Sequence, residues 1–139
     1  IANKEGIMFN ILIADDANQI HLIVKSILHD YFSSDFSCDS VYDGAEAKNI
    51  YNIKQHQLVI TDIYMPHMDG FDLTIYFKTC EKPPFVIAIS ANPQYGGANV
   101  TSLEKVRELG ADAIVAKTDL FEQLPKALDR FFHIKTHAI

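Results

Sequence analysis

The chain has 139 residues, of which 48% are hydrophobic, and its formal net charge at neutral pH is −6. That length allows one sizeable hydrophobic core and leaves little chain for a second domain. The negative charge and the scattered lysines exclude a basic patch for nucleic acid on this chain alone. No apolar run reaches the roughly 20 residues that cross a bilayer, so we expect no membrane segment.

Cys38 and Cys80 are far apart in the sequence and form no Cys-x-x-Cys pair. We interpret both as small hydrophobic residues, buried or half-buried, which suits a reducing compartment such as the cytoplasm. We expect one folded domain over residues 9–133, with residues 1–8 as an N-terminal extension and residues 134–139 as a C-terminal tail. The six histidines are interpreted as solvated or structural.

Short apolar runs alternate with amphipathic segments along the chain, which predicts parallel strands joined by crossover helices. The first run, residues 11–14, is apolar throughout and is typical of a strand covered on both faces. The next segment predicts a helix over about residues 17–31, because its apolar residues recur at spacings of three and four. These residues are Ile20, Ile23, Val24, Ile27, Leu28 and Tyr31.

The second strand is predicted at residues 36–41, where apolar and polar residues alternate as in an edge strand with one wetter face. Asp43 and Gly44 then turn the chain into a second helix. The third strand, residues 58–61, delivers Asp62 into a loop that precedes a third helix.

Residues 85–89 form the most continuous apolar run and are the best candidate for a central strand. Ser90 stands at its end. Prolines and glycines predict a loop over residues 92–99, and a fourth helix is expected over about residues 100–109.

The fifth predicted strand, residues 113–116, ends at Lys117. An amphipathic helix follows, with apolar positions at Leu120, Phe121, Leu124, Leu128 and Phe131. Five strand and helix units in alternation therefore predict an α/β fold on a parallel sheet.

Polar side chains follow four of the predicted strands at their carboxyl ends. Asp15 and Asp16 follow the first strand, Asp62 the third, Ser90 the fourth and Lys117 the fifth. Ligands bind beyond the carboxyl ends of strands in open α/β sheets, so we expect these side chains to meet. An acidic pair alone more often caps a helix, but three converging carboxylates favour a bound cation, and oxygen ligands suit Mg²⁺. Asp62 is then the predicted nucleophile for a phosphoryl group.

The residues around these positions resemble those of bacterial response-regulator receiver domains, the CheY-like partners of sensor histidine kinases. The resemblance covers about residues 9–133 and depends on residues 11–16, 59–70, 89–91 and 109–117. It implies a flavodoxin-like, doubly wound fold with a five-stranded parallel sheet, (βα)5, in the strand order 2-1-3-4-5. It also implies a phosphoacceptor signalling domain that is not an enzyme, although it assists its own phosphorylation and dephosphorylation.

The resemblance implies a role for each residue of the site and a set of partners. The roles are Asp62 as phosphoacceptor, Asp15, Asp16, Asp62 and the backbone carbonyl of Tyr64 as Mg²⁺ ligands, Ser90 as switch hydroxyl and Lys117 as partner of the phosphoryl group. The donor is a phosphohistidine on a sensor histidine kinase or a histidine phosphotransfer protein, as in a phosphorelay. We expect phosphorylation to reshape the face formed by the fourth helix, fifth strand and fifth helix, which binds an effector, an output domain or a second copy of the chain.

Three positions bear on how such a switch would work. Ile114 stands where the family usually has an aromatic residue that swings on phosphorylation, and Thr118 stands where a proline usually follows the lysine. Tyr64, two residues after the acceptor, is predicted to shield an acyl phosphate from water.

Rival functions find less support. A phosphatase of the haloacid dehalogenase type would need a second acid at Tyr64, and a serine hydrolase would need Gly-x-Ser-x-Gly around Ser90. No glycine-rich phosphate loop follows Ala14 or Thr61. The remaining alternative is an interaction module that keeps the fold and signals without phosphorylation.

Overall fold

The computed structural model describes residues 6–90 and 107–137. Within them, five parallel strands form one sheet in the order β2-β1-β3-β4-β5, which confirms the predicted fold class and strand order. The strands are β1 (Phe9–Ala14), β2 (Phe36–Val41), β3 (Leu58–Asp62), β4 (Phe85–Ser90) and β5 (Ala113–Ala116). The alternating segment is an edge strand, as expected, and the most apolar run, β4, is buried along its whole length.

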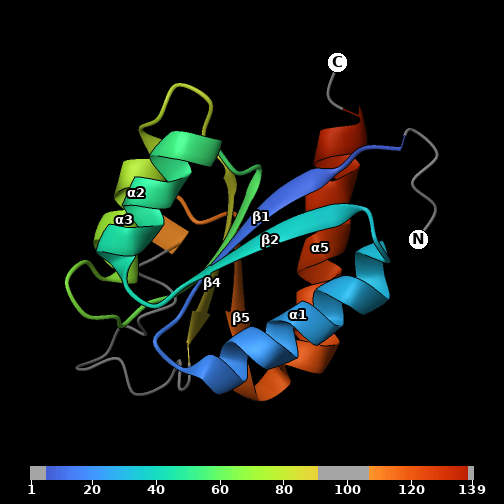
Figure 1. The fold of residues 1–139 in the computed structure, drawn as a ribbon, viewed down its shortest axis with the longest axis horizontal. Helices are drawn as coiled ribbons and strands as arrows, with labels where there is room; N and C mark the ends of the chain where they lie inside the picture. Colours follow the sequence, from blue (N-terminus) through green and yellow to red (C-terminus); the bar gives the residue numbers. More distant parts are fainter. Residues whose placement is uncertain (1–5, 91–106, 138–139) are drawn as a thin grey trace.

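Helices cover both faces of the sheet (Figure 1). They are α1 (Asn18–Phe32), α2 (Gly44–Lys54), α3 (Gly70–Lys78) and α5 (Leu120–His137), with a short 3-10 turn, η1 (Lys117–Asp119), before α5. The loop predicted at residues 92–99 lies outside the described residues. So does most of the fourth helix, of which Arg107 and Glu108 are described as helical.

Two hydrophobic clusters hold the layers together. One fills the space between the sheet and the pair α1 and α5, where the Phe9 ring meets those of Phe32 and Phe131 at centroid distances of 5.5 and 5.1 Å. The other lies between the sheet and the pair α2 and α3, and includes Tyr51 and Phe77. A sheet buried on both faces needs strands that are apolar throughout, which is the pattern of β1, β3 and β4.

The strand register brings four strand ends to one edge of the sheet. Ala14 pairs with Thr61 and Asp62 pairs with Ile89. Ser90 in turn pairs with Ala116. The residues that follow β1 and β5, and those that end β3 and β4, therefore share the carboxyl edge.

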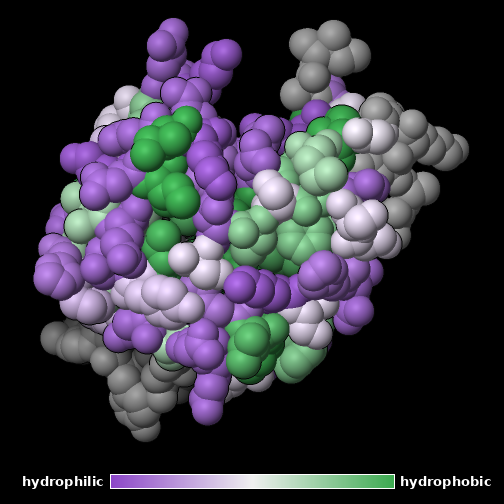
Figure 2. Space-filling view, in the orientation of Figure 1, coloured by the Kyte–Doolittle hydropathy of each residue, from purple (hydrophilic) through white to green (hydrophobic). Residues whose placement is uncertain are grey.

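The surface is mostly hydrophilic in the view of Figure 2, where apolar side chains appear as separate patches over α2, β2 and α1. Among the described residues, none of the helices is both long and apolar enough to cross a membrane. Cys38 and Cys80 are free and half-buried, as expected. His21 and His56 are buried, with exposed fractions of 1% and 2%.

Two glycines allow the loop after β3 to pack closely. A Cβ at Gly44, the first residue of α2, would lie 1.9 Å from the Met68 carbonyl oxygen. A Cβ at Gly70, the first residue of α3, would lie 2.3 Å from the carbonyl oxygen of Asp62. Inside the same loop, His67 has a φ of +69°, a left-handed conformation that is uncommon for residues other than glycine. The loop that receives Asp62 is thus fixed by close backbone contacts.

Gly70→Ala is expected to lower the free energy of unfolding by about 1–3 kcal/mol, because the added methyl group must displace the backbone that carries Asp62. Urea denaturation followed by circular dichroism measures the effect. Asn49→Ala, at an exposed position of α2, is the control and should not lower the midpoint. Equal midpoints for Gly70→Ala and Asn49→Ala would contradict the close packing of this loop.

Candidate functional site

Asp62 ends β3 with its carboxylate almost fully buried, at an exposed fraction of 6%. Its Oδ1 accepts a hydrogen bond from the backbone N–H of Ile63 at 2.9 Å. The Thr61 hydroxyl donates to the Asp62 carbonyl oxygen at 2.9 Å. These bonds fix both the backbone and one carboxylate oxygen, which leaves Oδ2 as the oxygen available to a ligand or a reactant.

Asp15 and Asp16 follow β1, next to Asp62 on the neighbouring strand. Asp15 is fully buried, and its Oδ1 accepts a hydrogen bond from the N–H of Ala17 at 2.8 Å. Asp16 is exposed. The three carboxylates each offer an oxygen within 4.8 Å of the others, the grouping that the strand pattern predicted.

Lys117 supplies the positive charge of the cluster. Its Nζ lies 2.7 Å from Asp15 Oδ2 and 3.4 Å from Asp62 Oδ2, so the ammonium group bridges two carboxylates and lies closer to Asp15. Lys117 is the first residue of η1 and is followed by Thr118. The side chain of Lys117 thus reaches both carboxylates although the residue that follows it is threonine and not proline.

Ser90 and Tyr64 lie in chain segments at the carboxyl edge of the sheet, Ser90 at the end of β4 and Tyr64 after β3. Ser90 ends β4 and is buried, with an exposed fraction of 3%. Tyr64 lies in the loop after β3 and is 55% exposed, and its ring forms a T-shaped contact with the Phe71 ring at a centroid distance of 5.9 Å. A buried hydroxyl and an exposed aromatic ring therefore lie in segments that leave the same edge of the sheet.

The chemistry of this cluster suits a hard divalent cation. All its donors are carboxylate oxygens, and Asp15 Oδ2 is buried with Lys117 Nζ as its close neighbour but without a hydrogen bond of good geometry. Carboxylate oxygens are the donors that Mg²⁺, Ca²⁺ and Mn²⁺ prefer, whereas zinc sites usually contain thiolate or imidazole. The residues present therefore fit a metal ion of the first group.

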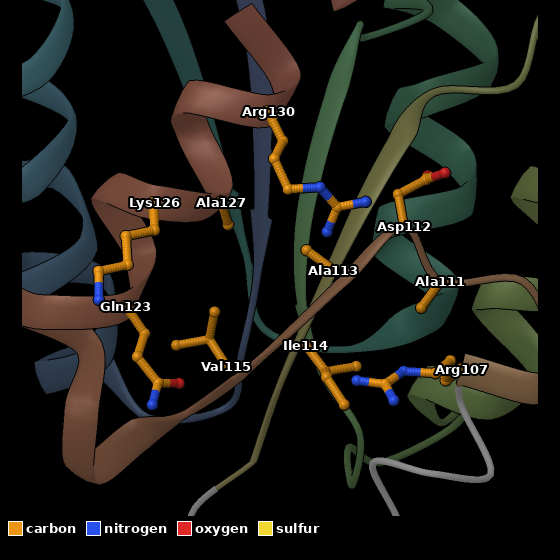
Figure 3. A pocket seen from close by; sticks show the side chains of 10 residues that line it. All are labelled: Arg107, Ala111, Asp112, Ala113, Ile114, Val115, Gln123, Lys126, Ala127 and Arg130. Carbon is orange, nitrogen blue, oxygen red and sulfur yellow. The ribbon is translucent and has the colours of Figure 1, made fainter.

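A cleft lies along β5, with side chains of α5 on one side of the strand and Arg107 and Ala111 on the other (Figure 3). It has a volume of about 490 Å³, and Ala113, Ile114 and Val115 of β5 are among its lining residues. Three basic residues also line it: Arg107, Lys126 and Arg130. The acid among its lining residues, Asp112, forms an ion pair with Lys78 at 2.7 Å. The cleft therefore combines apolar walls with positive charge in a chain of net charge −6.

Comparison with known proteins identifies the family. Residues 11–129 match the sequence pattern of the response regulator receiver domain. The chain belongs to this family. This receiver domain is 30% identical over 124 residues to the chemotaxis protein CheY of Listeria monocytogenes, covering 88% of the chain and 98% of that protein.

Other curated relatives are much longer. The receiver domain is 28% identical over 119 residues to the sensor histidine kinase RcsC of Salmonella typhi, which is 85% of the chain and 12% of that protein. It is 33% identical over 85 residues to the sensor protein EvgS of Escherichia coli K12, which is 61% of the chain and 7% of that protein. The chain thus spans only a small part of these sensor proteins.

Solved structures share the fold. The receiver domain of a sensor histidine kinase from Pseudomonas aeruginosa PAO1, solved with magnesium in its active-site cleft, has a TM-score of 0.75 at 21% identity and covers 89% of the chain and 97% of its own. The N-terminal domain of a Wolinella succinogenes protein has a TM-score of 0.74 at 28% identity and covers 92% of the chain and 97% of its own.

Burial raises the pKa of the Asp62 carboxyl from its ordinary value to about 6. The Lys117 ammonium group opposes this rise, the Asp15 carboxylate adds to it, and the hydrogen bond from Ile63 lowers the pKa again. Desolvation thus outweighs the favourable charge of the lysine. At neutral pH the receiver domain still holds Asp62 mainly in its ionised form, as a nucleophile or a metal ligand requires.

Two histidine features were not predicted from the sequence, one beside the site and one on α5. His21 lies in the first turn of α1, and its Nε2 is 2.7 Å from the Asp15 carbonyl oxygen. A contact between this side chain and the backbone cannot be predicted from a residue pattern. His133 and His137 stand four residues apart on α5 with their rings stacked at 4.2 Å. That spacing is visible in the sequence, but neither residue belongs to a group of three metal-binding side chains within the described residues.

Asp62→Asn is expected to stabilise the metal-free receiver domain. With a native pKa near 6 and an unfolded pKa near 3.9, the native state binds more protons than the unfolded state between about pH 4 and pH 6. The contribution of Asp62 to stability therefore falls as pH rises through that window. Above it, the carboxamide should raise the free energy of unfolding by about 1–3 kcal/mol.

Urea denaturation in a chelator from pH 4 to pH 7 measures this difference. The increase in the free energy of unfolding that Asp62→Asn causes should grow from pH 4 to pH 6 and then level off. Asp30→Asn, at an exposed position of α1, is the control and should follow the wild-type curve. A gain that is the same at every pH would show that Asp62 titrates as in the unfolded chain.

Proposed function

We propose that this receiver domain accepts a phosphoryl group on Asp62 in a Mg²⁺-dependent reaction and passes the signal on through a changed protein surface. The observation that supports this most is the meeting of Asp15, Asp16 and Asp62 oxygens within 4.8 Å, with Lys117 in ion-pair contact with two of these residues. Phosphoryl transfer is catalysed mainly by positioning and charge stabilisation, which is what such a cluster supplies.

The transfer needs one nucleophilic oxygen and one donor. Asp62 Oδ2 attacks the phosphorus of a phosphohistidine, an O–P bond forms, and the N–P bond of the donor breaks as its imidazole regains a proton. Lys117 Nζ, 3.4 Å from Asp62 Oδ2, is close enough to pair with an oxygen of the incoming group. The Ser90 hydroxyl donates a hydrogen bond to another oxygen.

Mg²⁺ would be held by Asp15, Asp16, Asp62 and the backbone carbonyl of Tyr64, and when bound it would neutralise charge on the phosphoryl oxygens. Among the metal-ligand side chains, Asp15 is preset by its hydrogen bond to Ala17 N–H, and Asp62 by its bond to Ile63 N–H. Asp16 is exposed, so its side chain can adjust to the ion.

The partners follow from this chemistry. The phosphohistidine belongs to a sensor histidine kinase or a histidine phosphotransfer protein, and the reaction takes place in the cytoplasm as one step of a phosphorelay. Relatives of two kinds support such a role: sensor proteins in which the matching region is a small part, and a chemotaxis protein that matches over nearly its full length. The receiver domain acts as an acceptor that assists its own phosphorylation and dephosphorylation.

The output surface is the face beside β5, which includes the cleft of Figure 3. Ser90 pairs with Ala116 in the sheet, so a shift of Ser90 toward the phosphoryl group acts on the strand that lines the cleft. Arg107, Lys126 and Arg130 favour a partner that offers acidic side chains around an apolar residue. The partner is an effector, an output domain or a second copy of the chain.

Incubation with acetyl phosphate and Mg²⁺ should add one phosphoryl group to the wild type and none to Asp62→Asn, because the carboxamide is not a nucleophile. Intact-protein mass spectrometry gives the count. Asp43→Asn is the matched control, since asparagine caps α2 as well as aspartate does and this residue lies outside the site.

The same experiment has two outcomes that would contradict the proposal. A phosphoryl group retained by Asp62→Asn would place the acceptor elsewhere. A wild type that neither gains mass nor binds beryllofluoride with Mg²⁺ would favour an interaction module that signals without phosphorylation.

Tyr64→Asn is expected to shorten the lifetime of the phosphorylated state by about threefold or more, because the small polar side chain no longer covers the acyl phosphate. Loss of the phosphoryl group is followed by mass spectrometry after the donor is removed. Tyr64→Phe, which keeps the ring against Phe71, should retain the wild-type lifetime. Equal rates for the asparagine and phenylalanine variants would exclude shielding by the ring.

A further inference from the structure

We propose that His21 is a positioning residue of the acidic site: its imidazole holds the peptide group between Asp15 and Asp16, and so sets the geometry in which the carboxylates meet a metal ion. This inference rests on the proposed Mg²⁺ site. His21 itself touches neither the metal position nor the phosphoryl position, and acts through the backbone.

The contact is buried and directional. His21 lies in the first turn of α1, is 1% exposed, and its Nε2 lies 2.7 Å from the carbonyl oxygen of Asp15. A carbonyl oxygen can only accept, so Nε2 must carry the hydrogen. This fixes the tautomer of a neutral ring, with Nδ1 unprotonated.

The carbonyl group that His21 holds belongs to the peptide unit leading into Asp16. The other side of Asp15 is held as well, because its N–H donates to the Val41 carbonyl oxygen at 3.2 Å. Its side-chain Oδ1 accepts from Ala17 N–H at 2.8 Å. With His21 in place, the backbone of Asp15 is fixed on both sides, and the direction in which the chain enters Asp16 is set.

The imidazole ring is itself held in position. It packs against the ring of Tyr42 at a centroid distance of 4.5 Å, and the Tyr42 hydroxyl donates to Asn18 Oδ1, one turn before His21, at 3.2 Å. Nδ1 is buried and has no hydrogen-bond partner among the described residues. Burying this unpartnered nitrogen costs free energy, so an apolar side chain of similar size would be more favourable here if the bond at Nε2 had no role. The unpartnered nitrogen indicates that the bond to Asp15 is the reason for a histidine here.

Loss of such a supporting hydrogen bond around a metal site typically weakens metal binding 10–100-fold. His21→Leu keeps most of the volume and removes the donor, so its Mg²⁺ dissociation constant, measured by isothermal titration calorimetry on the full chain, should rise by about that factor. His21→Gln carries an amide N–H close to the position of Nε2 and should stay within about threefold of the wild type.

His56→Leu is the matched control. His56 is equally buried and its Nε2 donates to the Asp39 carboxylate at 2.8 Å, but it lies before β3, at the opposite edge of the sheet from the site. It should lower the midpoint of urea denaturation and leave Mg²⁺ affinity unchanged. A merely structural role for His21 predicts the same behaviour for His21→Leu.

The outcomes separate this inference from the function on which it rests. Equal Mg²⁺ affinity in wild type and His21→Leu, or equal loss in the leucine and glutamine variants, overturns the positioning role while the metal site stands. A wild type that binds no Mg²⁺ overturns both. If His21→Leu does not fold, His21→Asn replaces it, because the shorter amide occupies the Nδ1 position and cannot reach the Asp15 carbonyl.

Discussion

The meeting of three carboxylates at one sheet edge is the constraint on which the rest of the structure depends. Two unit charges 4 Å apart at an effective dielectric constant near 20 repel each other by about 4 kcal/mol, and Asp15, Asp16 and Asp62 have oxygens within 4.8 Å of one another. The folded chain meets part of this cost with Lys117, which contacts both buried carboxylates. The rest of this free-energy cost is offset by the hydrophobic contacts between the sheet and the helices on its two faces. A cation or a proton can relieve it. The pKa of Asp62 is raised first by burial and then, in addition, by the Asp15 carboxylate.

Burial of the Asp62 carboxylate lowers stability, but it also strengthens the electrostatic interactions of the site. Removing Asp62 from water strengthens every interaction of its carboxylate with Lys117, and would strengthen those with a phosphoryl group in the proposed function, because the local dielectric constant is low. The close backbone contact at Gly70 holds the backbone of Asp62, and the bond from Ile63 holds its Oδ1, so the direction of Oδ2 is fixed as well. A site of this kind is costly when empty and favourable when it binds charge of the right sign, so ligand binding and stability are coupled.

Much of this architecture could be predicted from residue patterns, and the reasons for success and failure are physical. Continuous apolar runs located β1, β3 and β4 because a strand covered on both faces tolerates few polar residues. The site followed from the rule that parallel strands share their carboxyl edge. The unequal reach of Lys117 and the bond from His21 to a backbone carbonyl could not be predicted, because they depend on side-chain conformation and loop packing. The spacing of His133 and His137, in contrast, can be recognised in the sequence, and the interpretation of the histidines missed it.

The strand β5 connects the carboxylate cluster, which Lys117 contacts, with the cleft of Figure 3. It is four residues long and, within residues 6–90 and 107–137, pairs with β4 alone, so its displacement breaks fewer backbone hydrogen bonds than displacement of an inner strand would. Lys117 follows its last residue, whereas Ile114 lines the cleft three positions earlier, which is about 10 Å along an extended chain. Val115, between them, is packed in the core against α5. In the proposed function, a pull on Lys117 or Ser90 by new negative charge would therefore act on the cleft through the backbone of a short edge strand, and this path would require no aromatic side chain at residue 114.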